Sequence, residues 1–94
     1  MEIKISDYGW GIDRRTGQRN ENLLEEVTFP NVKEGDTLEV GEIKHQFIIN
    51  KIEGNSINMT VNRKGDKVDI KIGEKHTYKP FSFDGGHYYV IEVK

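Results

Sequence analysis

The chain has 94 residues, a net charge of −2 and no cysteine. This length suits one domain, and the lack of cysteine excludes disulfide bonds, thiol catalysis and thiolate metal sites. Charges of both signs are mixed along the chain, which gives no concentrated basic face for duplex nucleic acid. No apolar stretch approaches the roughly 18 residues that membrane insertion requires. No signal peptide is visible before the first alternating segment. The sequence therefore leaves two alternatives, a cytoplasmic protein and a module of a longer protein, and does not decide the compartment.

The apolar residues are of the kind that favours β-structure. The chain contains 11 Ile and 7 Val against 3 Leu, and it has no Ala. β-Branched side chains pack well on a pleated sheet, whereas Ala and Leu are strong helix formers. We therefore predict an all-β fold in a single small domain over residues 1–94.

Alternation of apolar and polar residues, interrupted by turn residues, divides this domain into strands. The first strand starts at Ile3 and ends near Tyr8, and a long polar loop is expected over residues 9–22. Further strands are expected at residues 24–29, 38–40, 46–52, 57–61, 68–72 and 89–93, with an irregular extended segment at 78–83. Seven or eight short antiparallel strands of this kind form either a β-sandwich or a β-barrel.

Two segments of the chain resemble each other weakly. At an offset of 32 residues, the ranges 38–61 and 70–93 share four identities, two of which are glycines in expected turns. Duplication of an ancestral unit explains this pattern, and so do two β-hairpin units of similar length.

The segment around the expected loop holds the only Trp and three of the four Arg residues. Aromatic rings stack on flat apolar faces, and guanidinium groups bind carboxylate or phosphate oxygens. The candidate ligand-binding residues are therefore Tyr8, Trp10, Arg14, Arg15 and Arg19. The alternative is that Trp10 closes one end of the core while the arginines are solvated.

Arg15-Thr-Gly-Gln-Arg19 has the RxxxR spacing of PilZ-type cyclic-dinucleotide receptors, which are also small β-barrels. That family carries a second motif downstream, D/N-x-S-x-x-G, which this chain matches only in part. The nearest match here runs from Asp36 to Gly41, and Leu38 stands where the family has Ser. The resemblance implies binding of a cyclic dinucleotide by Arg15 and Arg19.

The three histidines, His45, His76 and His87, give a metal hypothesis. Three imidazoles with a carboxylate such as Asp84 suit a catalytic zinc ion, which takes three protein ligands and keeps one open position. No compact motif of the HExxH type places two of them on one face. Solvated surface histidines are the competing explanation, and a small metal-dependent enzyme is the alternative function.

Near the C-terminus, Tyr88 and Tyr89 are adjacent, so only one of them can face the core. If Tyr89 packs inward with Ile91 and Val93, then Tyr88 and Val90 face outward and form a candidate protein or homodimer interface. With no cofactor motif in view, we predict a non-catalytic binding or interaction module. Its partner is expected to be a protein or a small polar or anionic ligand.

Overall fold

The computed structural model describes all 94 residues and contains eight β-strands and no α-helix. The strands are β1 (Ile3–Ile12), β2 (Arg19–Phe29), β3 (Thr37–Val40), β4 (His45–Glu53), β5 (Ser56–Thr60), β6 (Lys67–Lys71), β7 (Lys75–Tyr78) and β8 (Gly85–Val93). The all-β prediction is therefore confirmed. The chain also has no helix of the length and apolarity needed to span a bilayer.

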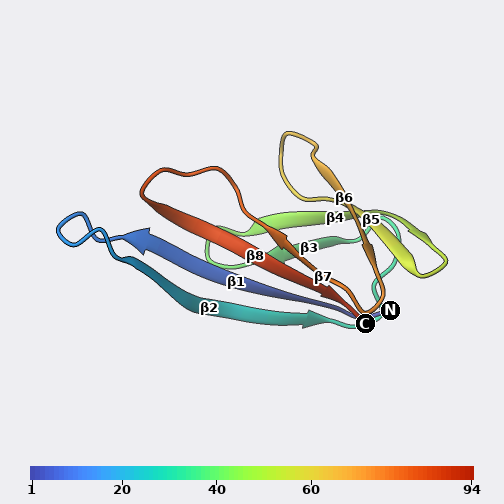
Figure 1. The fold of residues 1–94 in the computed structure, drawn as a ribbon. Helices are drawn as coiled ribbons and strands as arrows, with labels where there is room; N and C mark the ends of the chain where they lie inside the picture. The colour runs from blue at the N-terminus through green and yellow to red at the C-terminus, as the bar shows by residue number, and fades with distance from the viewer.

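The strands form two four-stranded antiparallel sheets, with orders β2-β1-β8-β7 and β3-β4-β5-β6. We call them the N/C sheet and the central sheet. Both keep free edge strands, so the domain is a sandwich and not a closed barrel. Figure 1 shows the two sheets as separate layers, with the chain termini side by side. Glu2 and Lys94 exchange two backbone hydrogen bonds at that end.

The core lies between the sheets and follows directly from the alternation of side chains along the strands. Tyr89, Ile91 and Val93 are fully buried on β8, while Tyr88 and Val90 point to the outer face, as expected. Fourteen buried hydrophobic residues make up the cluster, with Phe47, Ile49, Ile57 and Met59 from the central sheet facing Ile3, Ile5 and Ile91 from the N/C sheet.

The expected loop over residues 9–22 is wrong. β1 continues to Ile12 and β2 begins at Arg19, so only residues 13–18 connect the two strands. Asp13 and Gln18 close this turn through a backbone hydrogen bond of 2.8 Å, and Gly17 takes a φ of 73° within it. Gly9 and Gly11 broke the apolar alternation in the sequence, yet both pair regularly with β2 and β8.

Two further expectations differ from the structure. The extended segment expected at 78–83 is instead the end of β7 followed by a connection to β8. The ranges 38–61 and 70–93 do not form equivalent units. The first contributes β3, β4 and β5 to one sheet, whereas the second starts in β6 and crosses to β7 and β8 of the other sheet.

The N/C sheet is longer than the central sheet, which decides where a site can form. β1, β2 and β8 have 10, 11 and 9 residues, whereas β3, β5 and β6 have 4, 5 and 5. The β1–β2 hairpin therefore projects beyond the central sheet (Figure 1). At that end a cavity lies between the two sheets outside the core, and we call this opening the mouth of the sandwich.

Candidate functional site at the mouth of the sandwich

A layer of aromatic side chains closes the core toward the mouth. His45 on β4 packs against Tyr89 on β8 with 4.7 Å between ring centroids, and against Tyr78 on β7 at 5.8 Å. Phe47 lies one inward position deeper and contacts Tyr89 edge-on. The layer places polar ring atoms at the boundary between the apolar core and an open pocket of about 640 Å³. We call this cavity the mouth pocket.

Two tyrosine hydroxyls in this layer have opposite hydrogen-bonding states. The hydroxyl of Tyr78 accepts a hydrogen bond from the Asn62 side chain at 3.0 Å. The hydroxyl of Tyr89 is buried and has no partner. Burial, together with the nearby negative charge of Asp7, raises the pKa of Tyr89 above its ordinary value of 10. Tyr89 therefore keeps its proton and holds an unused donor under the lining of the mouth pocket.

Asp7 and His87 form a polar pair beside this layer. Asp7 occupies an inward position of β1, is only 1% exposed, and its Oδ1 lies 2.8 Å from Nδ1 of His87. The partner of His87 across the strands is Gly9, whose missing side chain leaves room for Leu24. A buried carboxylate needs a donor, because leaving it unpaired in a medium of low polarity is costly. His87 supplies that donor.

The hydrogen bonds assign the protons on both imidazoles of the mouth pocket. A carboxylate only accepts, so Nδ1 of His87 donates to Asp7 and Nε2 is the atom left for another partner. Nε2 of His45 lies 2.6 Å from the carbonyl oxygen of Val61, which also only accepts, so that Nε2 donates. Each ring is therefore held in one orientation, as a group that contacts a ligand must be.

The charged side chains around the mouth pocket are mostly basic. Arg63, Lys64 and Lys79 line it, and none of them takes part in an ion pair. Asp66 is the only carboxylate in the lining, and it accepts a hydrogen bond from Asn62. This basic excess stands out in a chain whose net charge is −2.

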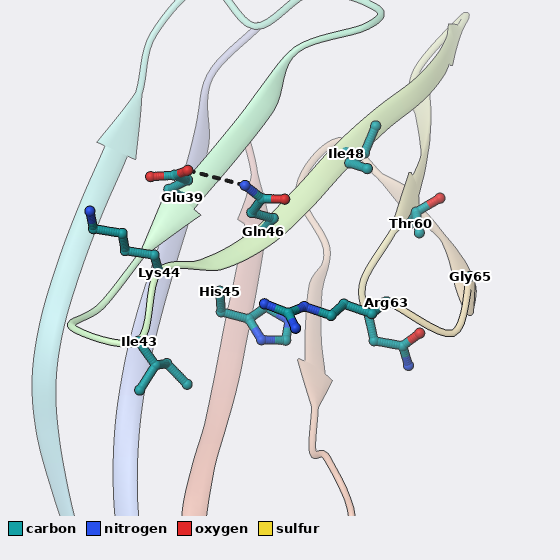
Figure 2. Close-up of a pocket in the computed structure, with 10 residues that line it drawn as sticks. Glu39, Ile43, Lys44, His45, Gln46, Ile48, Thr60, Arg63 and Gly65 are labelled. Atoms are coloured by element: carbon teal, nitrogen blue, oxygen red, sulfur yellow. Dashed lines mark hydrogen bonds between the residues drawn. The ribbon is translucent and has the colours of Figure 1, made fainter.

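A second groove, of about 800 Å³, adjoins the mouth pocket over the outer face of the central sheet. His45, Asn62 and Arg63 line both cavities. Figure 2 shows the Arg63 side chain extending from the β5–β6 connection toward the ring of His45. On the far side of this groove Gln46 donates to Glu39 at 3.1 Å, so that Glu39 is engaged. Arg63 thus stands at the border between the groove and the mouth pocket.

The predicted ligand-binding residues do not gather in one place. Tyr8, Trp10 and Arg19 lie on the outer face of the N/C sheet, on the side away from the core. Arg14 pairs with Asp84, and Arg15 lies near Asp13 in the exposed hairpin turn. The resulting arrangement is an outer aromatic face and a separate turn, rather than one binding loop.

The Trp10 ring already carries cations from the protein itself. The guanidinium of Arg19 lies 4.7 Å from the ring centroid and the ammonium of Lys79 lies 5.1 Å from it, both within the range of a cation–π contact. Arg19 also pairs with Glu21 at 2.6 Å. Trp10 is half-buried, which matches neither a free stacking surface nor a side chain sealed in the core.

Tyr88 completes this outer face. Its ring stacks on Tyr8 at 4.9 Å, and its hydroxyl donates to Glu21 at 2.9 Å. That hydrogen bond lowers the pKa of Glu21, while burial and the same bond raise the pKa of Tyr88. Tyr88 and Val90 have the outward orientation expected of an interface, and the interface itself stays a prediction.

The three histidines do not form a ligand set. His45 and His87 both line the mouth pocket, whereas His76 lies on β7 opposite Ile91. No three His, Cys, Asp or Glu side chains are close enough together to hold a metal ion. Asp84, expected as a fourth ligand, pairs with Arg14. The zinc arrangement inferred from sequence is therefore not assembled.

The PilZ-like motif is likewise dispersed. Arg15 lies in the β1–β2 turn, whereas Arg19 is engaged with Glu21 on β2. Asp36 accepts a hydrogen bond from the backbone of Lys33, and Gly41 follows β3 beside Asp7. Comparison of the chain with protein-family models, with curated proteins and with solved structures finds no match.

The main residues of the mouth that sequence reasoning missed are Asp7, Asn62, Arg63 and Tyr89. Only Asp7 carried a signal, because it continues the inward series of Ile3 and Ile5 with a charged residue. A charge at an inward position is expected to have a buried partner. The partner, His87, lies 80 residues away along the chain.

Proposed function

We propose that this domain is a non-catalytic binding module that takes a small anionic ligand in the mouth pocket. The observation that carries the proposal is the charge of the lining. Arg63 and Lys64 line this cavity without ion pairs in a chain of net charge −2, and Lys79 lines it too, although its ammonium lies 5.1 Å from the Trp10 ring centroid. Clefts lined by one sign of charge concentrate ligands of the opposite sign.

The rest of the lining supports a ligand with a flat, partly apolar body. Tyr78 and Phe81 contribute aromatic surface, and Pro80 adds an apolar wall. Aromatic surface with a few fixed polar groups is the usual composition of a small-molecule site. The anionic group would lie toward Arg63, while His87 Nε2 would contact a polar group of the ligand.

The proposal is tested by amide chemical-shift titration of the full chain with phenyl phosphate, inorganic phosphate and, as a neutral control, phenol. Phenyl phosphate should shift the amides of residues 62–65, 79–82 and 87–89, and phosphate should shift a subset of them. Arg63→Ala should weaken phenyl phosphate binding about tenfold, because a hydrogen bond to a charged group contributes roughly 1.5–3 kcal/mol. Arg15→Ala, in the exposed hairpin turn, is the matched control and should leave binding unchanged.

Three results would contradict the proposal. The first is the absence of saturable shifts with phenyl phosphate at millimolar concentration. The second is an equal response to phenol, which would indicate an apolar site in which the basic lining plays no part. The third is an equal loss of binding in Arg63→Ala and Arg15→Ala, since this would show attraction to the net charge and not to a site.

A further inference from the structure

β2 forms a long open edge of the N/C sheet. It has 11 residues and pairs only with β1, and almost every residue along it is exposed. The other three edge strands, β3, β6 and β7, have only 4, 5 and 4 residues. Edge strands usually carry a protective device such as shortness, Lys or Pro. β2 is protected only by charged side chains and a β-bulge, not by shortness, Lys or Pro, and its outer backbone pairs with no other strand.

A β-bulge in β2 turns two consecutive side chains toward the same side. Asp7 pairs with Glu25 and Tyr8 pairs with Leu23, so Leu24 is the extra residue. The Leu24 side chain lies against Gly9, where a Cβ atom would come within 3.0 Å of it. Leu24 and Glu25 therefore both face the gap between β2 and the β3–β4 connection. Bulges that re-aim side chains in this way are common beside functional sites.

This gap is an acidic pocket of about 220 Å³, which we call the side pocket. Glu25 and Glu42 stand at its walls with Leu24 and Ile43, and neither glutamate forms an ion pair. Asp7 also lines it, although Asp7 is 1% exposed. No Lys or Arg lines the side pocket, in contrast to the mouth pocket.

The two oxygens of the Asp7 carboxylate differ in their contacts. Oδ1 binds His87, whereas Oδ2 makes no hydrogen bond and points toward Gly41. Gly41 has a φ of 81°, and a Cβ atom at this position would collide with Oδ2 of Asp7. Without a side chain at residue 41, Oδ2 keeps room beside the side pocket and can accept a hydrogen bond from a donor placed there.

We propose that β2 accepts an extended peptide as an added strand, with a lysine or arginine of that peptide placed in the side pocket. The open backbone of β2 supplies main-chain hydrogen bonds, which give affinity without sequence preference. The side pocket supplies the preference, because Glu25, Glu42 and Oδ2 of Asp7 attract one basic side chain, while Leu24 and Ile43 contact its aliphatic part. The side pocket adjoins the mouth pocket, with which it shares Ile43 and His87, but its acidic lining selects the opposite charge from the anionic ligand proposed there.

The test uses two blocked nine-residue peptides, Ser-Val-Thr-Val-Lys-Val-Thr-Val-Ser and its variant with Glu at the centre. The lysine peptide should shift the amides of residues 19–29 and slow their hydrogen exchange, and it should bind at least tenfold more tightly than the glutamate peptide. The double variant Glu25→Lys/Glu42→Lys should reverse this preference. Glu53→Lys, an exposed substitution at the end of β4, is the control and should not change it. Arg63→Ala should leave peptide binding intact.

Each of the following outcomes would overturn the proposal. The first is that neither peptide shifts the amides of residues 19–29 at millimolar concentration. The second is that the lysine and glutamate peptides bind equally, or that the double variant keeps the original preference although its spectrum shows the native fold. The third is that the chain alone dimerises through β2, so that the amides of residues 19–29 shift as the protein concentration is raised. In that case a second copy of the chain, and not a basic peptide, is the occupant.

Discussion

Replacing Tyr89 with phenylalanine should stabilise the folded protein, although it removes a polar atom from the core boundary. The hydroxyl of Tyr89 is buried and has no hydrogen-bond partner. A buried polar group without a partner costs about 1–3 kcal/mol, so its removal should raise the free energy of unfolding by about 1 kcal/mol. In a domain of this size, that corresponds to an increase in Tm of roughly 4–8 °C.

Tyr78→Phe is the matched control, because it removes a hydroxyl that has a partner. Asn62 donates to the Tyr78 hydroxyl at 3.0 Å. Loss of this bond should lower the free energy of unfolding by about 1 kcal/mol, so the two substitutions should have opposite signs. Urea unfolding followed by far-UV circular dichroism measures both. If Tyr89→Phe lowers the free energy of unfolding by more than about 0.5 kcal/mol, the Tyr89 hydroxyl has a partner in solution and our reasoning about it is wrong.

The same experiment bears on the proposed function. Phenyl phosphate binding should weaken in Tyr89→Phe if the hydroxyl is kept for the ligand. A gain in stability together with a loss of binding is expected at functional sites, where strain or unsatisfied groups are retained for activity. Unchanged binding would show that the unpartnered hydroxyl has no part in the mouth pocket.

Four further predictions concern the pairs and the turns. His87→Gln should lower the free energy of unfolding by about 1–3 kcal/mol, because it removes the Nδ1 hydrogen bond to the buried Asp7 carboxylate. His76→Gln, measured by the same urea unfolding, should change the free energy of unfolding by less than about 0.5 kcal/mol. Gly41→Ala should lower the free energy of unfolding clearly more than Gly73→Ala. Both glycines have a positive φ, which costs about 1–2 kcal/mol for alanine, but only the Cβ at residue 41 would collide with Asp7. Equal losses of unfolding free energy in the two variants would contradict this. In absorbance titration at 295 nm, Tyr89 should ionise only above the ordinary tyrosine pKa of 10, because burial raises its pKa in the fold. Its proton is held more tightly in the folded than in the unfolded chain, so the free energy of unfolding should not depend on this group below pH 10 and should fall as the pH rises further. A phenolate signal from all four tyrosines near pH 10 in the folded protein would refute this. Tyr88→Phe should bring the pKa of Glu21 back toward its ordinary value of 4.5. Because that pKa is lowered in the fold, the stabilisation from Glu21 is present above pH 4.5 and is lost as the pH falls. Carboxyl NMR titration of the native protein and of the variant measures this pKa.

Local alternation in the sequence determined the fold class and most of the inward faces. The inward positions of β8 followed from a period of two, and with them the outward positions of Tyr88 and Val90. The excess of Ile and Val over Leu and Ala favoured strands throughout, and no helix is present. These features depend on each residue and its near neighbours, so a single sequence is enough to predict them.

The error over residues 9–22 has a physical cause. Glycine and polar residues in a segment are read as a loop, because their local preferences favour turns. Here Gly9 and Gly11 lie in a strand that is paired on both sides, and the missing side chain of Gly9 makes room for Leu24. Pairing with two neighbouring strands outweighs the local preference.

Both candidate sites were decided by tertiary structure alone. Asp7 and His87 meet because β1 and β8, the first and last strands, are neighbours in one sheet, and His45 reaches Tyr89 only because the two sheets pack face to face. The bulge at Leu24 and the overhang of the N/C sheet likewise depend on register and on the unequal lengths of paired strands. The sequence by itself determined which residues face inward along each strand, because side-chain alternation is local. Only the packing of the whole chain decided which inward residues meet at an open end, because strand order and register are set by contacts between distant segments.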